Sequence, residues 1–336
     1  MGIKKIKVVN FKSFENIEVE LGKFNVLIGA NASGKSNFVQ IFKFLKDIAD
    51  SGLENAVSVQ GGVKYLRNIK IGASKDLSIR VVSDDKFALA IPTKDGLIGV
   101  KNYETTYEFA LSFYKRRAGF KIKRDRLNQK FKFVVLEKQV KGFKEKEVIG
   151  EGEVLISRSN GKVKIDLTKP QDVPIKEDDL FPPILKEIDI PSNVLFLETP
   201  IFSFFFLLPI KQIFSYISIY DFDPKLPKKA TSITVKAELE EDGSNLSLVL
   251  KNILAHKEKR RKLLNLMKDL LPFVEDLYVE KFADESPFFK LKERYFEKEY
   301  LPASLISDGT IDITALITAL YFGKKPLIII EEPERN

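Results

Sequence analysis

The stretch Gly29-Ala30-Asn31-Ala32-Ser33-Gly34-Lys35-Ser36 matches the pattern G-x-x-x-x-G-K-[ST]. Its two glycines let the backbone curl until consecutive N–H groups face inward, toward a phosphate. The lysine reaches the β- and γ-phosphates of a nucleotide, and the serine hydroxyl that follows is placed to ligate Mg²⁺. The stretch therefore predicts a loop that binds nucleotide phosphates together with a magnesium ion.

The residues on either side of this loop supply the expected context. Residues 24–28 form a short apolar run, for which we expect a strand that leads into the loop. After Ser36, apolar side chains recur every three or four positions until a stop signal at Gly52. This period predicts a helix whose positive N-terminus points at the same phosphates. Alternating residues at 5–8 and 17–21 predict two earlier strands.

Two acidic residues follow an aliphatic run near the other end of the chain. Residues 327–330 are all Leu or Ile, and Glu331 and Glu332 come directly after them. A buried strand has no use for two carboxylates unless they meet a cation or activate water, although strands also end in charge on reaching solvent. Combined with the loop, the pair indicates that Glu331 completes the Mg²⁺ shell and Glu332 polarises the attacking water.

The composition excludes several other chemistries. The 336 residues include no cysteine and one histidine, His256. Disulfides, thiolate zinc sites and a cysteine nucleophile are therefore excluded, and a Ser-His-Asp triad is not expected. The most apolar stretch, 201–210, is shorter than the roughly 20 residues that a membrane span needs. With no secretory signal at the N-terminus, we expect a cytoplasmic protein with no membrane partner.

Several stretches resemble one known family. The sequences IKVVNFKSF at 6–14 and NVLIGANASGKSN at 25–37 resemble ABC-type P-loop ATPase heads of the SMC/RecF-like group. They resemble most closely small prokaryotic ATPases described as AAA-family or RecF-like. DGSNL at 242–246, LISDGT at 305–310 and EEPE at 331–334 agree. The resemblance implies an α/β fold, a P-loop NTPase (ABC ATPase-like) core with a β-rich insert and a helical segment.

The resemblance also implies Mg²⁺-dependent ATP hydrolysis between two heads of a homodimer. In such heads the counterpart of Ser307 and Gly309 is the ABC signature, at the start of a helix that caps the γ-phosphate of the other subunit. The same residues are also typical of an ordinary turn and helix cap. The predicted nucleotide-binding residues are Gly29, Ala30, Asn31, Ala32, Ser33, Gly34, Lys35, Ser36, Asn37, Ser307 and Gly309, the metal ligands are Ser36 and Glu331, and the catalytic residues are Lys35 and Glu332.

The chain departs from this family at several positions. Glu331 stands where most ABC proteins carry aspartate, and no glutamine can be placed in a Q-loop. The chain stops at Asn336, where such proteins usually continue through a D-loop and a switch histidine, so the resemblance implies a head truncated just after Walker B. Phe11 and Phe14 are candidates for stacking on adenine, although phenylalanines at strand ends are more often core residues.

Positive charge is concentrated in one segment. Residues 115–146 contain 13 lysines and arginines against three acidic residues, a local charge of +10, with aromatic residues interleaved. These cations would neutralise DNA phosphates if strands place them on one face. They would equally suit the solvated face of a β insert. A second basic cluster, 257–262, is more typical of a solvated helix surface.

The organisation expected along the chain follows from these motifs. It comprises half of the ATPase core (1–100), a β-rich basic insert and linker (101–192), core strands (193–244), a helical segment (245–300) and the signature helix with the Walker B strand (301–336). Within it we expect strands over 77–167, helical periodicity over 245–280 broken near Pro272, a helix at 311–322 and a buried strand at 327–330.

Two functions remain open at this point. The first is a clamp on DNA, driven by ATP, in repair, chromosome maintenance or phage defence. The second is an ATP-switched regulatory protein that controls a separate effector nuclease or toxin and does not bind DNA itself. A transporter subunit is disfavoured, because the segment at 307–310 lacks the glutamine that ends the transporter signature.

Overall fold

The computed structural model of the chain describes residues 2–94, 96–115, 118–140, 142–159, 162–199, 208–229, 238–281, 286–296 and 299–334. These residues form two compact units, Met1–Tyr216 and Ile217–Asn336.

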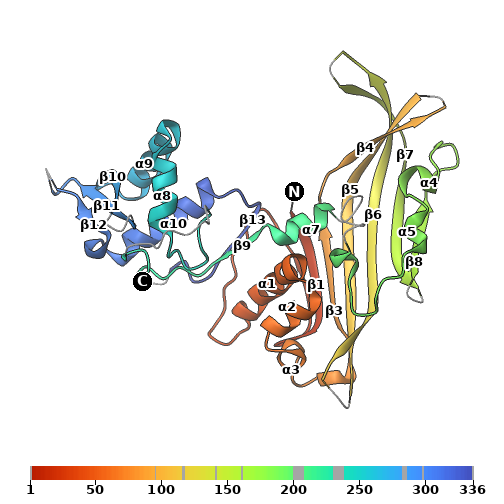
Figure 1. Ribbon diagram of the computed structural model, residues 1–336, viewed down its shortest axis with the longest axis horizontal. Coiled ribbons are helices and arrows are strands. Elements are labelled where there is room, and N and C mark those ends of the chain that lie inside the picture. Colours follow the sequence, from red (N-terminus) through yellow and green to blue (C-terminus); the bar gives the residue numbers. More distant parts are fainter. Residues whose placement is uncertain are drawn as a thin grey trace. The chain divides into compact units, whose positions relative to one another are not determined.

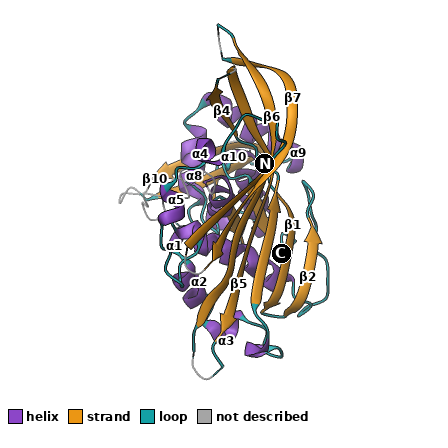
Figure 2. Cartoon of the chain, turned by 90° about the vertical axis from the view of Figure 1, so that its right-hand side faces the viewer, coloured by secondary structure: helices purple, strands orange, loops and turns teal. Residues whose placement is uncertain are grey.

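The first unit is built on one large antiparallel sheet. Its strands are β1 (Ile3–Phe11), β2 (Phe14–Glu20), β3 (Leu77–Ser83), β4 (Ala88–Thr93), β5 (Gly96–Phe113), β6 (Phe120–Lys138), β7 (Phe143–Ser159) and β8 (Lys162–Thr168). They follow the order β2-β1-β3-β5-β6-β7-β8, and β4 pairs with the first part of β5. Figure 2 shows the long strands β5, β6 and β7 in this sheet. The opening pair of strands and the run of strands predicted over 77–167 are confirmed.

Helices pack beside β1 and β3 in this unit (Figure 1). They are α1 (Lys35–Ser51), α2 (Leu53–Val59) and α3 (Val63–Leu66). The apolar spacing after Ser36 forms the buried face of α1, where the Phe44 ring lies 5.8 Å from that of Phe11 in β1. The helix ends at Gly52 (φ 88°), as predicted. Shorter helices follow, α4 (Glu177–Leu180), α5 (Ile184–Glu187) and α7 (Leu208–Ser215), of which α7 packs on α1.

A buried polar cluster fixes residues 191–199 to the sheet. The carboxylate of Asp125, in β6, is fully buried and accepts hydrogen bonds from the Tyr107 hydroxyl (2.8 Å) and the Phe196 N–H (2.7 Å). Arg158 Nη2 lies 3.5 Å from the same carboxylate. Burial raises the pKa of Asp125 to about 7, because desolvation outweighs the donors and the positive charge that favour the ionised form.

The second unit combines a pair of parallel strands with helices and a small antiparallel sheet. Its elements are β9 (Ile217–Tyr220), α8 (Leu246–Leu254), α9 (Lys257–Leu270), β10 (Val274–Lys281), β11 (Pro287–Glu293), β12 (Leu301–Pro302), α10 (Asp308–Phe322) and β13 (Leu327–Ile330). β13 pairs with β9, and the antiparallel sheet has the order β10-β11-β12. One core joins α8, α9 and α10 to this sheet through side chains such as Leu250, Met267, Leu277, Phe289 and Ile311.

Residues 24–28 do not form a strand, so that prediction is wrong. The side chains of Phe24, Val26 and Ile28 have exposed fractions of 85%, 64% and 90%. An apolar run predicts burial, but a strand also needs a neighbour for its backbone N–H and C=O groups. Within the described ranges no strand pairs with this segment.

The helical pattern predicted over 245–280 is also wrong in part. The break between helices falls at residues 255–256 rather than near Pro272, and 274–281 form β10, which pairs with β11. Val274 and Leu277 both face the core, and their three-residue spacing imitates a helix. The signature helix begins at Asp308, three residues before its predicted start.

The strand predicted at 327–330 has the observed bounds of β13, but its side chains are half-buried rather than buried. In the part of the chain that the structure describes, β13 has one neighbouring strand, and this leaves its apolar side chains partly uncovered. The turn expected at 159–162 includes 160–161, and the apolar stretch 201–210 includes 201–207; both sets lie outside the described residues.

Candidate nucleotide-binding site

The loop at 29–36 is closed by contacts between its lysine side chain and its backbone. Lys35 Nζ donates hydrogen bonds to the carbonyl oxygens of Gly29 (2.6 Å) and Ala30 (3.1 Å). Ala32 (φ 64°) and Gly34 (φ 102°) take left-handed backbone conformations. Alternation of this kind turns successive N–H groups toward one side, where they form a concave site for an anion. Within the loop the Ser33 N–H donates to the Ala30 carbonyl oxygen at 3.2 Å. The binding of phosphate by the loop stays a prediction.

The first turn of α1 offers hydrogen-bond donors to a ligand. Gly34 is the N-cap residue, no side chain caps the helix, and no acidic residue lies in the first turn. The first N–H groups of a helix lack partners within it, and the helix dipole adds positive charge there. Ser36 is exposed, and its hydroxyl makes no hydrogen bond to any described residue. These groups fit the phosphates and the Mg²⁺ ion that the sequence predicts.

The turn between β1 and β2 lies against this loop. A Cβ atom at Gly34 would meet Ser13 Oγ at 3.2 Å and the Phe14 ring at 3.4 Å, so the close approach suits glycine. Phe11 is fully buried and is a core residue rather than a surface for stacking. Phe14 is half-buried beside the loop and stays a candidate for contact with the nucleotide.

Asn10 supports the same turn, a role that sequence reasoning did not identify. Its backbone is left-handed (φ 56°) and its side chain is buried. Asn10 Nδ2 donates to the carbonyl oxygens of Gly72 (3.1 Å) and Lys75 (2.7 Å), and its Oδ1 accepts the N–H of Asn68 (3.0 Å). Asn10 thereby holds the 68–75 segment against the end of β1. Its place in the NFKSF motif was the signal that could have marked it.

In the second unit, the two predicted acids leave β13 in different ways. The Glu331 N–H donates to the Tyr220 carbonyl oxygen at 2.8 Å, which extends the pairing with β9 by one residue. Glu332 has a left-handed backbone (φ 44°), an uncommon conformation for a residue with a side chain. Backbone strain of this kind clusters at functional sites. The chain therefore turns sharply at the residue predicted to position water.

Asp221 lies beside Glu331 and was missed by sequence reasoning. Tyr220 pairs with Ile330, so the residues that follow, Asp221 and Glu331, leave the parallel strands side by side. Ligands of open α/β sheets bind at this edge, outside the carboxyl ends of the strands. No local signal marks Asp221, because its position depends on a pairing between distant segments.

Ser307 and Gly309 lie at the start of α10, as predicted. Ser307 is the N-cap residue, and its Oγ accepts the N–H of Thr310 at 3.2 Å. A Cβ atom at Gly309 would meet nothing within 4 Å, so the backbone there faces open space. Ser307 thus performs the ordinary capping role, and its action on a second subunit stays a prediction.

Charged side chains surround this helix start. Lys228 Nζ lies 2.5 Å from Asp308 Oδ1. One turn further along α10, burial raises the pKa of Asp312 to about 6, with smaller contributions from the negative charges of Asp308 and Asp223. An anion that approached α10 would therefore meet both the helix dipole and nearby carboxylates.

The predicted site residues are divided between the two units. Residues 29–37 belong to the first unit, and Ser307, Gly309, Glu331 and Glu332 belong to the second. Their convergence on one nucleotide stays a prediction.

Among the described residues, five cations of the 115–146 segment form ion pairs with acidic residues of the first unit. Lys115, Lys121, Arg126, Lys138 and Lys144 have no ion pair within the described ranges. The pairs are Lys123–Asp76 (2.6 Å), Lys130–Glu104 (2.7 Å), Lys132–Glu151 (3.3 Å), Lys146–Glu137 (3.1 Å) and Arg124–Glu108. The segment is therefore less positive toward an approaching ligand than its composition indicates.

The second basic cluster, 257–262, also has partners. Arg260 Nη2 donates to both carboxylate oxygens of Asp276 (2.9 and 3.0 Å), and Arg261 Nη2 donates to Glu258 Oε2 (2.8 Å). Lys262 Nζ lies 5.5 Å from the centre of the Tyr321 ring. These contacts fit a solvated helix surface.

Comparison with known proteins agrees with the loop geometry. Residues 1–169, just over half of the chain, match the AAA ATPase domain family, and the match includes the loop at 29–36. A search of curated proteins finds no match to the chain. No helix among the described residues is both long and apolar enough to cross a membrane. The mixed α/β fold, with its large antiparallel sheet and its helices, is consistent with a P-loop ATPase domain, and the chain belongs to the AAA ATPase domain family.

Proposed function

We propose that this protein binds ATP and hydrolyses it to ADP and phosphate, at a site that combines residues 29–37 with Glu331 and Glu332. The observation that carries the proposal is the conformation of the loop, in which Lys35 Nζ donates to the Gly29 and Ala30 carbonyl oxygens ahead of a helix with no side-chain cap. Membership of an ATPase domain family supports the same activity.

Each group in the proposed site has its own task. Lys35 and the N–H groups of the loop bind the β- and γ-phosphates. Ser36 and Glu331 hold Mg²⁺, which neutralises phosphate charge when it is bound. Glu332 accepts a hydrogen bond from the attacking water and takes its proton as the water oxygen bonds to the γ-phosphorus and the bond from the γ-phosphorus to the leaving oxygen of ADP breaks.

We further propose a head-to-head dimer of the RecF/SMC-like kind. In this arrangement Ser307 and Gly309 of one subunit approach the γ-phosphate that the other subunit holds. The open space at Gly309 supports this role, since an anion there could come close to the backbone. The negative charge of Asp308 opposes an anion, and its ion pair with Lys228 offsets that effect.

The work done by hydrolysis has two candidate forms. A DNA clamp would use the cations of the 115–146 segment. An ATP-switched regulator would instead contact a separate effector nuclease or toxin. The ion pairs of Lys123, Arg124, Lys130, Lys132 and Lys146 favour the regulator, because a paired cation contributes less to the release of counterions from DNA.

The test compares the wild-type chain with Glu332→Gln and a control, Glu334→Gln. We expect the wild type and the control to bind Mg·ATP and release phosphate. Glu332→Gln should bind ATP with the same affinity, turn over about 10²- to 10⁴-fold more slowly, and accumulate as a dimer. Fluorescent-nucleotide titration, phosphate release and sedimentation velocity measure these quantities.

Three outcomes would decide against parts of the proposal. Absence of ATP binding would refute the proposed ATPase activity as a whole. Equal turnover by wild type and Glu332→Gln would refute the proposed role of Glu332. A protein that stays monomeric at saturating ATP would refute the proposed dimer. Salt-sensitive binding to duplex DNA that is weakened by Lys121→Gln and Arg126→Gln would favour the DNA clamp instead of the ATP-switched regulator.

A further inference from the structure

Two exposed tyrosines share a hollow on the outer face of the β10-β11-β12 sheet. The side chains of Tyr278 and Tyr300 have exposed fractions of 53% and 37%. Their ring centroids are 6.2 Å apart, and the ring planes meet at 62°. The hollow has a volume of about 520 Å³ and is also lined by Glu280, Lys290 and Glu299. This volume is within the range of sites that bind small ligands.

The Tyr300 ring is held in place from its hydroxyl end. The Tyr300 hydroxyl donates to Asp276 Oδ2 at 2.9 Å. Arg260, from α9, binds both oxygens of the same carboxylate. This chain of contacts fixes Tyr300 before any ligand arrives, which lowers the conformational entropy lost on binding.

The two rings meet edge to face, so the ring that presents its edge is not covered on its faces by the other ring. Other exposed tyrosines of this protein already have a cation over the ring. The distances to the ring centres are 5.5 Å for Lys64 and Tyr65, 5.2 Å for Arg294 and Tyr295, and 5.5 Å for Lys262 and Tyr321. In the part of the chain that the structure describes, no cation lies over Tyr278 or Tyr300. A positively charged group placed there would be attracted by the aromatic rings.

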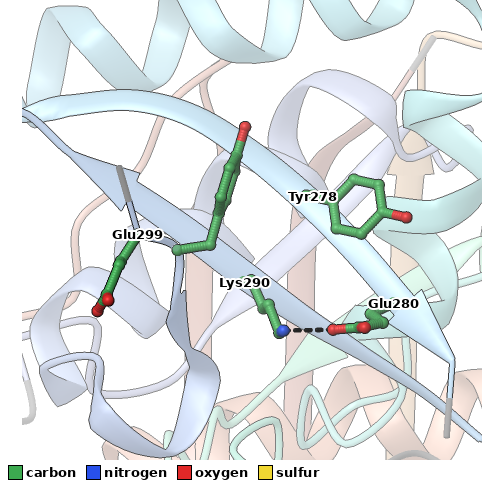
Figure 3. A pocket seen from close by; sticks show the side chains of 5 residues that line it. Tyr278, Glu280, Lys290 and Glu299 are labelled. Carbon is green, nitrogen blue, oxygen red and sulfur yellow. Dashed lines mark ion pairs between the residues drawn. The ribbon is translucent and has the colours of Figure 1, made fainter. Parts of the chain in front are cut away.

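The charges that line the hollow favour the same kind of ligand. Lys290 is paired with Glu280, as the dashed line in Figure 3 marks. Glu299 lies on the other side of Lys290 in Figure 3 and has no ion pair within the described ranges. The lining therefore carries two negative charges against one positive charge. This balance disfavours nucleic-acid phosphates and favours a cation.

We propose that this hollow binds an arginine or lysine side chain of a partner protein. The charged head of that side chain lies against the tyrosine rings, and the Glu299 carboxylate adds negative charge to the lining. Arginine suits the site better than lysine, because its planar guanidinium group stacks on aromatic rings while it donates hydrogen bonds to a carboxylate. The proposal concerns a protein partner with a basic segment and does not rest on ATP binding.

The test uses the 336-residue chain and acetyl-tetra-arginine amide as the probe, measured by isothermal titration calorimetry in low salt without nucleotide. We expect binding by wild type and by Tyr278→Phe, which keeps the ring. Tyr278→Ala and Glu299→Gln should each weaken binding about 3- to 10-fold. A matched control, Tyr65→Ala in the first unit, should bind the peptide as wild type does.

Tetra-glutamate and a 15-residue oligodeoxythymidylate are the competing probes. Neither should bind in a way that depends on Tyr278. Absence of arginine-peptide binding, or an unchanged affinity in Tyr278→Ala/Glu299→Gln, would overturn the proposal. Oligonucleotide binding that is lost in Tyr278→Ala would assign the hollow to base stacking instead. Because the probes act without nucleotide, failure here is distinct from failure of the proposed ATPase.

Discussion

The two halves of the proposed nucleotide site are encoded in different ways. In the loop, Lys35 binds carbonyls six and five residues earlier in the chain, and α1 is anchored by eight buried side chains. The acidic half depends instead on pairing between β9 and β13, segments far apart in sequence, and β13 is half-buried. A site for phosphate can thus be specified by one short stretch, whereas the carboxylates for metal and water need long-range assembly.

The largest expected effect is a loss of stability when one isoleucine side chain is truncated in each half of the site. Ile41 in α1 is fully buried, and Ile41→Ala should cost about 3–4 kcal/mol of unfolding free energy. Ile329 in β13 is half-buried, and Ile329→Ala should cost about 1–2 kcal/mol. Urea unfolding with hydrogen exchange followed separately in each unit measures both values. Equal losses would mean that β13 is covered as fully as α1.

The lysine of the loop should dominate phosphate affinity. Lys35→Ala removes the one side-chain cation that the loop turns inward, and ATP should bind about 100-fold more weakly, a loss of about 2.7 kcal/mol. Lys23→Ala changes an exposed lysine that precedes the loop, serves as the control and should bind normally. A fluorescent ATP analogue with and without Mg²⁺ measures the affinities. If both variants bind alike, the loop is not the phosphate site.

The buried carboxylate of Asp125 should make the stability of the first unit depend on pH. Its pKa is raised to about 7 in the folded protein, against about 3.9 in an unfolded chain. Stability from its protonated form is therefore complete below about pH 4 and is lost as pH rises through 7. We expect the unfolding free energy to fall by about 2 kcal/mol between pH 5 and pH 8. Asp125→Asn should remove this slope, and a slope that persists in the variant would assign it to other groups.

The backbone of the loop should have a smaller effect that is still measurable. Gly34→Ala places a Cβ atom in a left-handed conformation and beside Ser13 and Phe14, at a cost of about 1–2 kcal/mol. ATP affinity should fall about tenfold if the loop keeps its shape for binding. Gly22→Ala is the matched control, because a Cβ atom there makes ordinary contacts and the backbone is not left-handed. Equal affinities would show that the loop adapts to the added methyl group.

Sequence patterns predicted the local features of this protein well. The helix α1, with its end at Gly52, and the bounds of β13 both depend on residues close together in the chain. A run of strands over 77–167, where β3 to β8 lie, was also predicted, because alternation and turns repeat over many residues. In each case the physical cause, a backbone conformation or an amphipathic period, is contained in the segment itself.

The features that were missed depend on distant partners. Residues 24–28 have the composition of a strand but no strand pairs with them in the part of the chain that the structure describes. The segment of β10 has apolar residues at a helical spacing but forms a strand because β11 pairs with it. The place of Asp221 beside Glu331 follows from the register of β9 and β13. The ion pairs of Lys130 with Glu104 and of Lys132 with Glu151 follow from the alignment of β6 with β5 and β7, which a count of charges cannot reveal.

The left-handed backbone of Glu332 has a consequence for engineering this protein. A residue with a Cβ atom in that conformation is disfavoured by about 1 kcal/mol, and glycine carries no such penalty. A screen for thermal tolerance alone would therefore enrich glycine at position 332. The selected variants would melt at higher temperature and would have lost the carboxylate proposed to activate water. At position 332, selection for stability therefore favours glycine, whereas selection for ATP hydrolysis favours glutamate.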